Sequence, residues 1–138
     1  MTQNLTRPTD GDVAAFIARA EPAGRREDAA VLLGLMTRVT GEGPVLWGTS
    51  MVGFGQYRYR YESGREGDSL VVGFSPRKAS MSLYGLQHHD VAPLLARLDP
   101  HKLGVSCLYV GRFGRLDLDV LEQLVDAGWR RGGLAGRV

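Results

Sequence analysis

Two adjacent cations, Arg77 and Lys78, lie in the polar segment Ser75-Pro76-Arg77-Lys78. A guanidinium and an ammonium beside a hydroxyl and exposed backbone N–H groups are donors that can hold a phosphate or a carboxylate. The alternative is a solvated hairpin turn whose charges keep a sheet soluble, since cations are common at protein surfaces. This segment is therefore the first candidate for a binding site.

Aromatic residues with polar tips form the second candidate. Tyr57, Tyr59 and Tyr61 alternate with polar residues over 56–62, which places the three phenols on one face of an extended strand. Trp47 precedes a glycine, where a bend in the backbone would expose its ring. Such side chains line pockets or interfaces. The alternative is that they pack the sheet against helices, because aromatic residues are favoured in strands.

The histidines do not predict a metal site. His88 and His89 are adjacent, so on a strand they would point to opposite faces, and His101 stands apart. The sequence has no His-x-His or HExxH spacing and too few ligands for a structural ion. We therefore expect ordinary loop histidines and no bound metal or cofactor.

The sequence contains no recognisable catalytic motif. It has no GxSxG elbow and no P-loop. Gly53-Phe54-Gly55 begins like a dinucleotide-binding loop, but Arg58 stands where a glycine is needed and a strand follows instead of a helix. A site assembled from scattered residues would leave no motif. The sequence thus leaves enzyme activity open and favours a binding role.

Length and charge narrow the classes of protein. The 138 residues predict a single domain with its core over about 10–129 and frayed ends. The 17 basic and 15 acidic residues are too balanced for a nucleic-acid or anionic-membrane surface. No apolar run nears 18 residues, the first residues lack the apolar core of a signal peptide, and the single Cys107 fits a reducing compartment. We expect a cytoplasmic protein.

Hydrophobic periodicity predicts helices at both ends of the chain. The first begins near residue 9 or 10, where Thr9 and Asp12 resemble a capping box, and it ends at Pro22. The other helices are predicted at about 25–40, 91–98 and 117–129. Glu27 and Asp28 are expected in the first turn of the helix over 25–40, where the helix dipole favours negative charge.

Between residues 45 and 109 the pattern changes to short strands and tight turns. Strands are predicted at 56–62, 70–74, 79–86 and 105–110, with 63–68 as a polar connection. Consecutive antiparallel strands joined by short turns form a meander. The predicted fold class is therefore α+β, with an antiparallel, meander-rich sheet flanked by N-terminal and C-terminal α-helices.

Several motifs, in order along the chain, resemble the YdhG-like family of uncharacterised α+β domains. They are Pro44-Val45-Leu46-Trp47-Gly48, Val52-Gly53-Phe54-Gly55, Tyr57–Tyr61, Ser63–Asp68, Val72–Lys78, His101–Tyr109 and Asp117–Leu121. The likeness covers roughly residues 27–125, and the fixed order of the motifs makes it specific. It implies a compact α+β domain and little about function.

One branch of that family is described as frataxin-like iron chaperones, so the resemblance implies iron handling as an alternative function. Iron delivery of that type uses an acidic helical ridge of hard oxygen ligands. In this sequence, acidic and basic residues are interspersed over the same segment: Asp10, Asp12, Arg19, Glu21, Arg25, Arg26, Glu27 and Asp28. The segment therefore departs from an acidic ridge.

The sequence favours a small binding module for an anionic small molecule or a protein partner. The candidate ligand-binding residues are Trp47, Tyr57, Ser75, Arg77, Lys78 and Lys102. The cations and the hydroxyl would hold the anion, and the aromatic rings would supply apolar contact. An iron-binding protein and a homodimerisation domain, with the aromatic strand face as its interface, are the alternatives.

Overall fold

The computed structural model describes residues 7–60, 64, 66–98, 101–104 and 107–134. The first elements are α1 (Val13–Ala18), α2 (Ala23–Thr40), β1 (Val45–Trp47), β2 (Met51–Phe54), β3 (Tyr57–Arg60), β4 (Glu66–Ser69), β5 (Val72–Pro76) and β6 (Met81–Tyr84). The remaining elements are η1 (His89–Val91), α3 (Ala92–Leu98), β7 (His101–Leu103), β8 (Cys107–Val110), η2 (Phe113–Arg115) and α4 (Leu118–Leu134). None of the described helices is long and apolar enough to cross a membrane.

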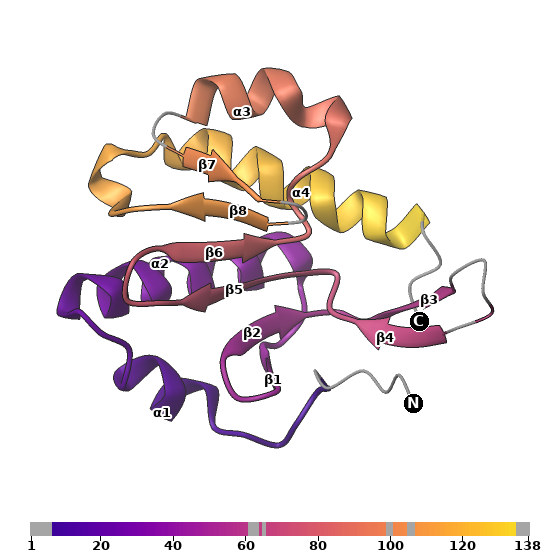
Figure 1. Ribbon diagram of the computed structural model, residues 1–138, viewed down its shortest axis with the longest axis horizontal. Helices are drawn as coiled ribbons and strands as arrows, with labels where there is room; N and C mark the ends of the chain where they lie inside the picture. The colour runs from indigo at the N-terminus through magenta and orange to yellow at the C-terminus, as the bar shows by residue number, and fades with distance from the viewer. Residues whose placement is uncertain (1–6, 61–63, 65, 99–100, 105–106, 135–138) are drawn as a thin grey trace.

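Six of these strands form one sheet in the order β1-β2-β5-β6-β8-β7, and every neighbouring pair is antiparallel. Strands β3 and β4 form a separate two-stranded ribbon that projects from the sheet (Figure 1). The predicted α+β class, with helices at both ends of the chain and an antiparallel sheet, is confirmed. The sheet is not a simple meander, because β8 lies between β6 and β7.

One face of the sheet carries the core. Along β2, β5, β6 and β8, alternate side chains point to this face and are fully or almost fully buried: Val52, Phe54, Val72, Phe74, Met81, Leu83, Leu108 and Val110. Helices α2 and α4 pack on this face and against each other, and α3 packs on α4 (Figure 1). The apolar stripes predicted from helical periodicity thus meet the apolar faces of the strands.

The opposite face, called the open face below, is built from small residues near β1. A Cβ atom at Gly53 would lie 2.7 Å from Trp47 Cδ1 and 2.8 Å from Leu70 Cβ. A Cβ at Gly73 would lie 2.4 Å from the carbonyl oxygen of Val52. Because these glycines have no side chain, Trp47 and Leu70 can lie directly against the strands, and both are buried.

The first helix starts later than its sequence predicts. Helix α1 begins at Val13, and Asp12 is its N-cap, with Asp12 Oδ1 accepting a hydrogen bond from the amide of Ala15 at 3.0 Å. The capping box at Thr9 was a wrong prediction. The amide and the hydroxyl of Thr9 both donate to the carbonyl of Leu46, at 2.8 and 2.9 Å, so this segment pairs with β1 instead.

Helix α2 starts two residues before its predicted boundary. Its first turn begins at Ala23, so Glu27 and Asp28 lie beyond that turn, and the prediction that they complement the helix dipole was wrong. The predicted stop is confirmed, since Gly41 adopts a left-handed conformation with φ of 71° and its amide donates to Thr37.

Three other boundaries differ from the prediction. The polar segment predicted as a connection contains β4, whose residues 66–69 pair with β3. Ser75 and Pro76 belong to β5, and the turn lies beyond them, where the amide of Arg77 donates to the carbonyl of Ser80. Helix α4 continues past Trp129, its predicted end, to Leu134. Tyr61, the last of the three tyrosines predicted on one strand face, lies outside the described residues.

Asp28 joins α2 to the chain beyond β8. Its Oδ2 atom accepts hydrogen bonds from Arg112 Nε and from the buried amide of Phe113, both at 3.0 Å. The Asp28 side chain is 6% exposed, whereas Glu27, which also contacts Arg112 at 3.3 Å, is 72% exposed. The two neighbouring carboxylates therefore differ in burial while sharing one partner.

We expect Asp28→Ala to destabilise the protein by about 2 kcal/mol, because a buried amide loses its acceptor. Glu27→Ala is the matched control and is expected to cost less than about 0.5 kcal/mol, because exposed ion pairs contribute little. Urea unfolding followed by circular dichroism measures both. Equal losses of stability in the two variants would contradict the role of Asp28 as the acceptor of a buried amide.

Candidate functional site

A pocket of about 430 Å³ lies where α1 approaches the ends of two hairpins, the β1–β2 turn and the β5–β6 turn. Three cations and three hydroxyl residues line it: Arg19, Arg77, Lys78, Thr49, Ser50 and Ser75. We call it the cationic pocket. It brings together three of the six residues predicted from the sequence, Ser75, Arg77 and Lys78, and adds Arg19 from α1's C-cap.

The positive charges of this pocket are not neutralised by ion pairs within the part of the chain that the structure describes. Among the described residues, the side chains of Arg19, Arg77 and Lys78 make no hydrogen bond or ion pair. Glu21 is the one carboxylate in the described lining, and it also makes no ion pair. The pocket therefore combines three cations with a single carboxylate.

Hydrogen bonds hold the hydroxyl side of the pocket in place. Ser75 is fully buried, and its hydroxyl donates to the carbonyl of Ser50, which ties β5 to the β1–β2 turn. The Ser75 hydroxyl proton is thus used inside the protein. Thr49 and Ser50 are the other hydroxyl groups that line the pocket.

A buried guanidinium lies under the β5–β6 turn. Arg25, in the first turn of α2, is only 5% exposed, and its Nη2 atom donates to the carbonyl of Lys78 at 3.4 Å. In the described part of the chain, Arg25 Nε and Nη1 have no hydrogen-bond partner. A buried charge without a full set of partners is costly. Arg25 therefore adds uncompensated positive charge next to the cationic pocket.

The other three predicted residues lie elsewhere, so the prediction of one combined site was wrong. Trp47 is 2% exposed and lines a pocket with Trp129, and Tyr57 lines a third pocket with Arg131. The bend at Gly48 is present, with φ of 62°, but it does not expose the Trp47 ring. Packing of the ring against Gly53 decides the burial of Trp47.

Lys102 lies on the edge strand β7, at the far side of the open face. Cross-strand pairs form the row Ser75, Ser82, Tyr109 and Lys102. Three strand spacings separate the ends of this row, a distance of about 14 Å. Because a lysine side chain cannot span that distance, Lys102 does not join Ser75 in the cationic pocket.

Tyr109 lies between these two positions. A side-chain hydrogen bond with Cys107 raises the pKa of the Tyr109 phenol above its usual value of 10.0, and the positive charge of Arg77 acts in the opposite direction. The phenol therefore stays neutral at physiological pH.

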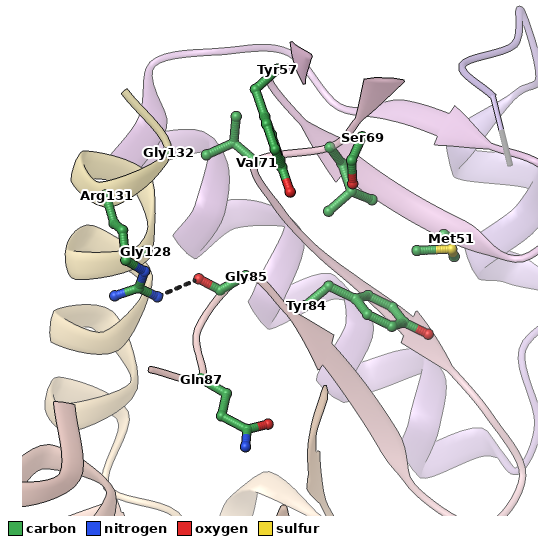
Figure 2. Close-up of a pocket in the computed structure, with 11 residues that line it drawn as sticks. Met51, Tyr57, Ser69, Val71, Tyr84, Gly85, Gln87, Gly128, Arg131 and Gly132 are labelled. Atoms are coloured by element: carbon green, nitrogen blue, oxygen red, sulfur yellow. Dashed lines mark hydrogen bonds between the residues drawn. The ribbon is translucent and has the colours of Figure 1, made fainter. Parts of the chain in front are cut away.

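The largest of the three pockets, about 470 Å³, lies between α4 and the strand ends (Figure 2). Arg131 extends from α4, and its Nη2 atom donates to the carbonyl of Gly85 at 3.0 Å, opposite the ring of Tyr84. Its Nη1 atom lies 3.6 Å from Asp90. The cation of this pocket therefore already has protein partners, unlike the cations of the cationic pocket.

Sequence reasoning missed Arg19 and Arg25. Arg19 was interpreted only as an interruption of acidic residues, and neither arginine belongs to a motif. Within the described residues, no group of three or more His, Cys, Asp or Glu side chains is placed to hold a metal ion. Compared with known proteins, the chain matches no family model, no curated protein and no solved structure.

Two glycines within helices, Gly128 and Gly34, distinguish the effect of packing on stability from the effect of helix propensity. A Cβ at Gly128, which lines the largest pocket, would lie 2.3 Å from the carbonyl oxygen of Gly85, whereas a Cβ at Gly34 would meet nothing within 4 Å. We expect Gly34→Ala to stabilise the protein by about 1 kcal/mol, through helix propensity alone. Gly128→Ala is expected to destabilise it by about 1 kcal/mol, because α4 must move away from the sheet.

Urea unfolding of both variants measures this difference in sign. A stabilising Gly128→Ala would mean that α4 does not pack on Gly85 as closely as described.

Proposed function

We propose that this protein is a binding module for a small anionic ligand, a molecule that presents a phosphate or a carboxylate to the cationic pocket. The observation that carries the proposal is the convergence of Arg19, Arg77 and Lys78 without ion-pair partners among the described residues. Three like charges in one concave surface repel one another, and an anion between them would remove that repulsion.

The surroundings of the cations support an anion rather than a wholly apolar ligand. Hydroxyl groups of Thr49 and Ser50 add polar partners, and the buried Arg25 adds positive potential behind Lys78. Phe16 and Pro76 supply apolar surface in the same pocket. A ligand with an anionic head and a short carbon skeleton fits this combination.

The alternatives gain less support. The described residues contain no cluster of metal-ligating side chains that would favour iron handling. For the tyrosine face predicted as a dimer interface, the structure places Tyr57 in the lining of the 470 Å³ pocket, and Tyr61 lies outside the described residues. We also propose common ancestry with the YdhG-like family, a likeness that points to no particular ligand.

We expect the double variant Arg77→Ala/Lys78→Ala to bind inorganic phosphate, pyrophosphate and citrate at least about tenfold more weakly than the wild type, because two charge-assisted contacts are lost. Arg19→Ala should weaken binding of the same anions, since α1 completes the pocket. Isothermal titration calorimetry at constant ionic strength, supported by thermal shifts, measures the affinities.

The control is Arg38→Ala/Arg130→Ala, which removes the same net charge from two exposed ion pairs, Arg38 with Glu122 and Arg130 with Asp126. This variant is expected to bind the anions like the wild type. If the control loses as much affinity as the pocket variant, binding reflects overall charge, and the proposed site is wrong.

A further inference from the structure

The charges in the lining of the cationic pocket indicate which kind of anion it fits. Arg19, Arg77 and Lys78 supply three positive charges and Glu21 supplies one negative charge, so the described lining has an excess of two positive charges. A phosphomonoester carries about two negative charges near neutral pH. A carboxylate or a phosphodiester carries a single charge and would leave part of the excess uncompensated. The charge balance therefore favours a phosphomonoester.

The wall formed by α1 holds one cation and the carboxylate. Arg19 and Glu21 are exposed and flank Ala20, which is buried. The amide of Ala20 donates to the carbonyl of Ile17 at 3.0 Å, and its carbonyl accepts a hydrogen bond from Arg26 Nη1 at 2.8 Å. Because burial of Ala20 anchors this segment, its two charged neighbours stay at the surface of the pocket.

A second wall, the β5–β6 turn, carries the other two cations. The amide of Arg77 donates to the carbonyl of Ser80 at 3.0 Å, and Arg25 Nη2 donates to the carbonyl of Lys78 at 3.4 Å. The side chains of Arg77 and Lys78 are exposed. Arg19 and these two cations come from different elements, so an anion in the pocket is held from more than one side.

A third element supplies neutral donors. Thr49 and Ser50, in the β1–β2 turn, line the pocket, and their hydroxyl groups make no hydrogen bond within the described part of the chain. The Ser75 hydroxyl is buried and donates to the Ser50 carbonyl, so it does not take part. A phosphomonoester has three terminal oxygens that point in different directions, whereas a carboxylate has two oxygens in one plane. Donors on three elements match the three oxygens of the phosphate.

The rest of the lining fits the organic part of an ester. Phe16 and Pro76 are half-buried and line the same pocket. The volume of about 430 Å³ lies in the range of pockets for organic ligands and exceeds what a phosphate group alone requires. Two aromatic rings in contact gain more than their buried area alone supplies. An aryl group on the ester oxygen therefore fits beside Phe16.

Resting on the function proposed above, we propose that the ligand of the cationic pocket is an aryl phosphomonoester. Arg19, Arg77 and Lys78 hold its phosphate together with the hydroxyl groups of the β1–β2 turn, and its ring lies against Phe16. Arg25 is 5% exposed, so it does not touch the ligand. Its charge behind Lys78 raises the preference for a doubly charged group.

Isothermal titration calorimetry of the full chain at constant ionic strength and about pH 8 tests the choice of anion. Phenyl phosphate is compared with methyl phenyl phosphate, which lacks one charge and one terminal oxygen, and with benzoate. Phenyl phosphate is expected to bind at least about tenfold more tightly than either compound. Equal affinity for phenyl phosphate and benzoate, or for phenyl phosphate and the diester, would overturn the proposal.

Variants separate the charge balance from the apolar contact. Glu21→Gln is expected to tighten binding of phenyl phosphate and of benzoate several-fold, because a repulsive charge leaves the lining. Glu42→Gln, the same change at an exposed carboxylate outside this lining, should alter neither affinity. Phe16→Ala should weaken phenyl phosphate several-fold and leave inorganic phosphate unchanged.

Glu21 is exposed, so its variant tests the site even if Phe16→Ala fails to fold. Unchanged affinities in Glu21→Gln would contradict the charge balance on which the inference rests.

These outcomes are separate from those that test the proposed function. If no anion binds in a way that Arg77→Ala/Lys78→Ala weakens, the proposed function itself is wrong. If benzoate binds as tightly as phenyl phosphate and that variant weakens both, the proposed function stands and the inference fails.

The aryl phosphomonoester could be a free molecule or a phosphorylated tyrosine of another protein. N-acetyl-phosphotyrosine amide and a short peptide that contains phosphotyrosine distinguish these sources. Tighter binding of the peptide indicates a protein segment, and equal binding indicates a free small molecule. If the phosphorylated peptide binds no more tightly than its unphosphorylated form and phenyl phosphate does not bind, the inference fails.

Discussion

The carboxylate of Asp28 holds the helical layer to the strand layer at the end of the molecule where the cationic pocket forms. It accepts hydrogen bonds from Arg112 Nε and from the amide of Phe113, just after β8. With α2 fixed at its first turns, Arg25 lies under the carbonyl of Lys78, and α1, which directly precedes α2, lies beside the β5–β6 turn. One buried carboxylate, together with the apolar side chains of α2 in the core, therefore fixes the arrangement of charges in the pocket.

The one-sided packing of the sheet explains why pockets form around the open face. Helices α2 and α4 cover one face of the sheet, so the opposite face is covered by side chains that lie flat against it. Missing side chains at Gly53 and Gly73 give Trp47 and Leu70 that room. The three pockets lie where this cover meets α1 or α4.

Two of these pockets carry opposite electrostatic character. The cationic pocket gathers three cations with one carboxylate, whereas the pocket lined by Trp47 and Trp129 includes Glu42 and has no cation in its described lining. If the cations and Glu42 shared one site, they would form ion pairs and neutralise one another. The two pockets share no lining residue, so the fold keeps these charges apart.

The α+β class follows from the sequence, because the change from helical to alternating periodicity is a local property of the residues. Gly41 as a helix stop and the charge of Arg77 and Lys78 are equally local. The grouping of the six candidate residues was not predictable: strand order separates Lys102 from Ser75, and packing on Gly53 buries Trp47. The same is true of Arg19, Arg25 and Trp129, whose roles come from neighbours distant in the chain. Sequence by itself determined which elements form and which charges are available, while long-range packing alone decided which of those charges and rings share a pocket.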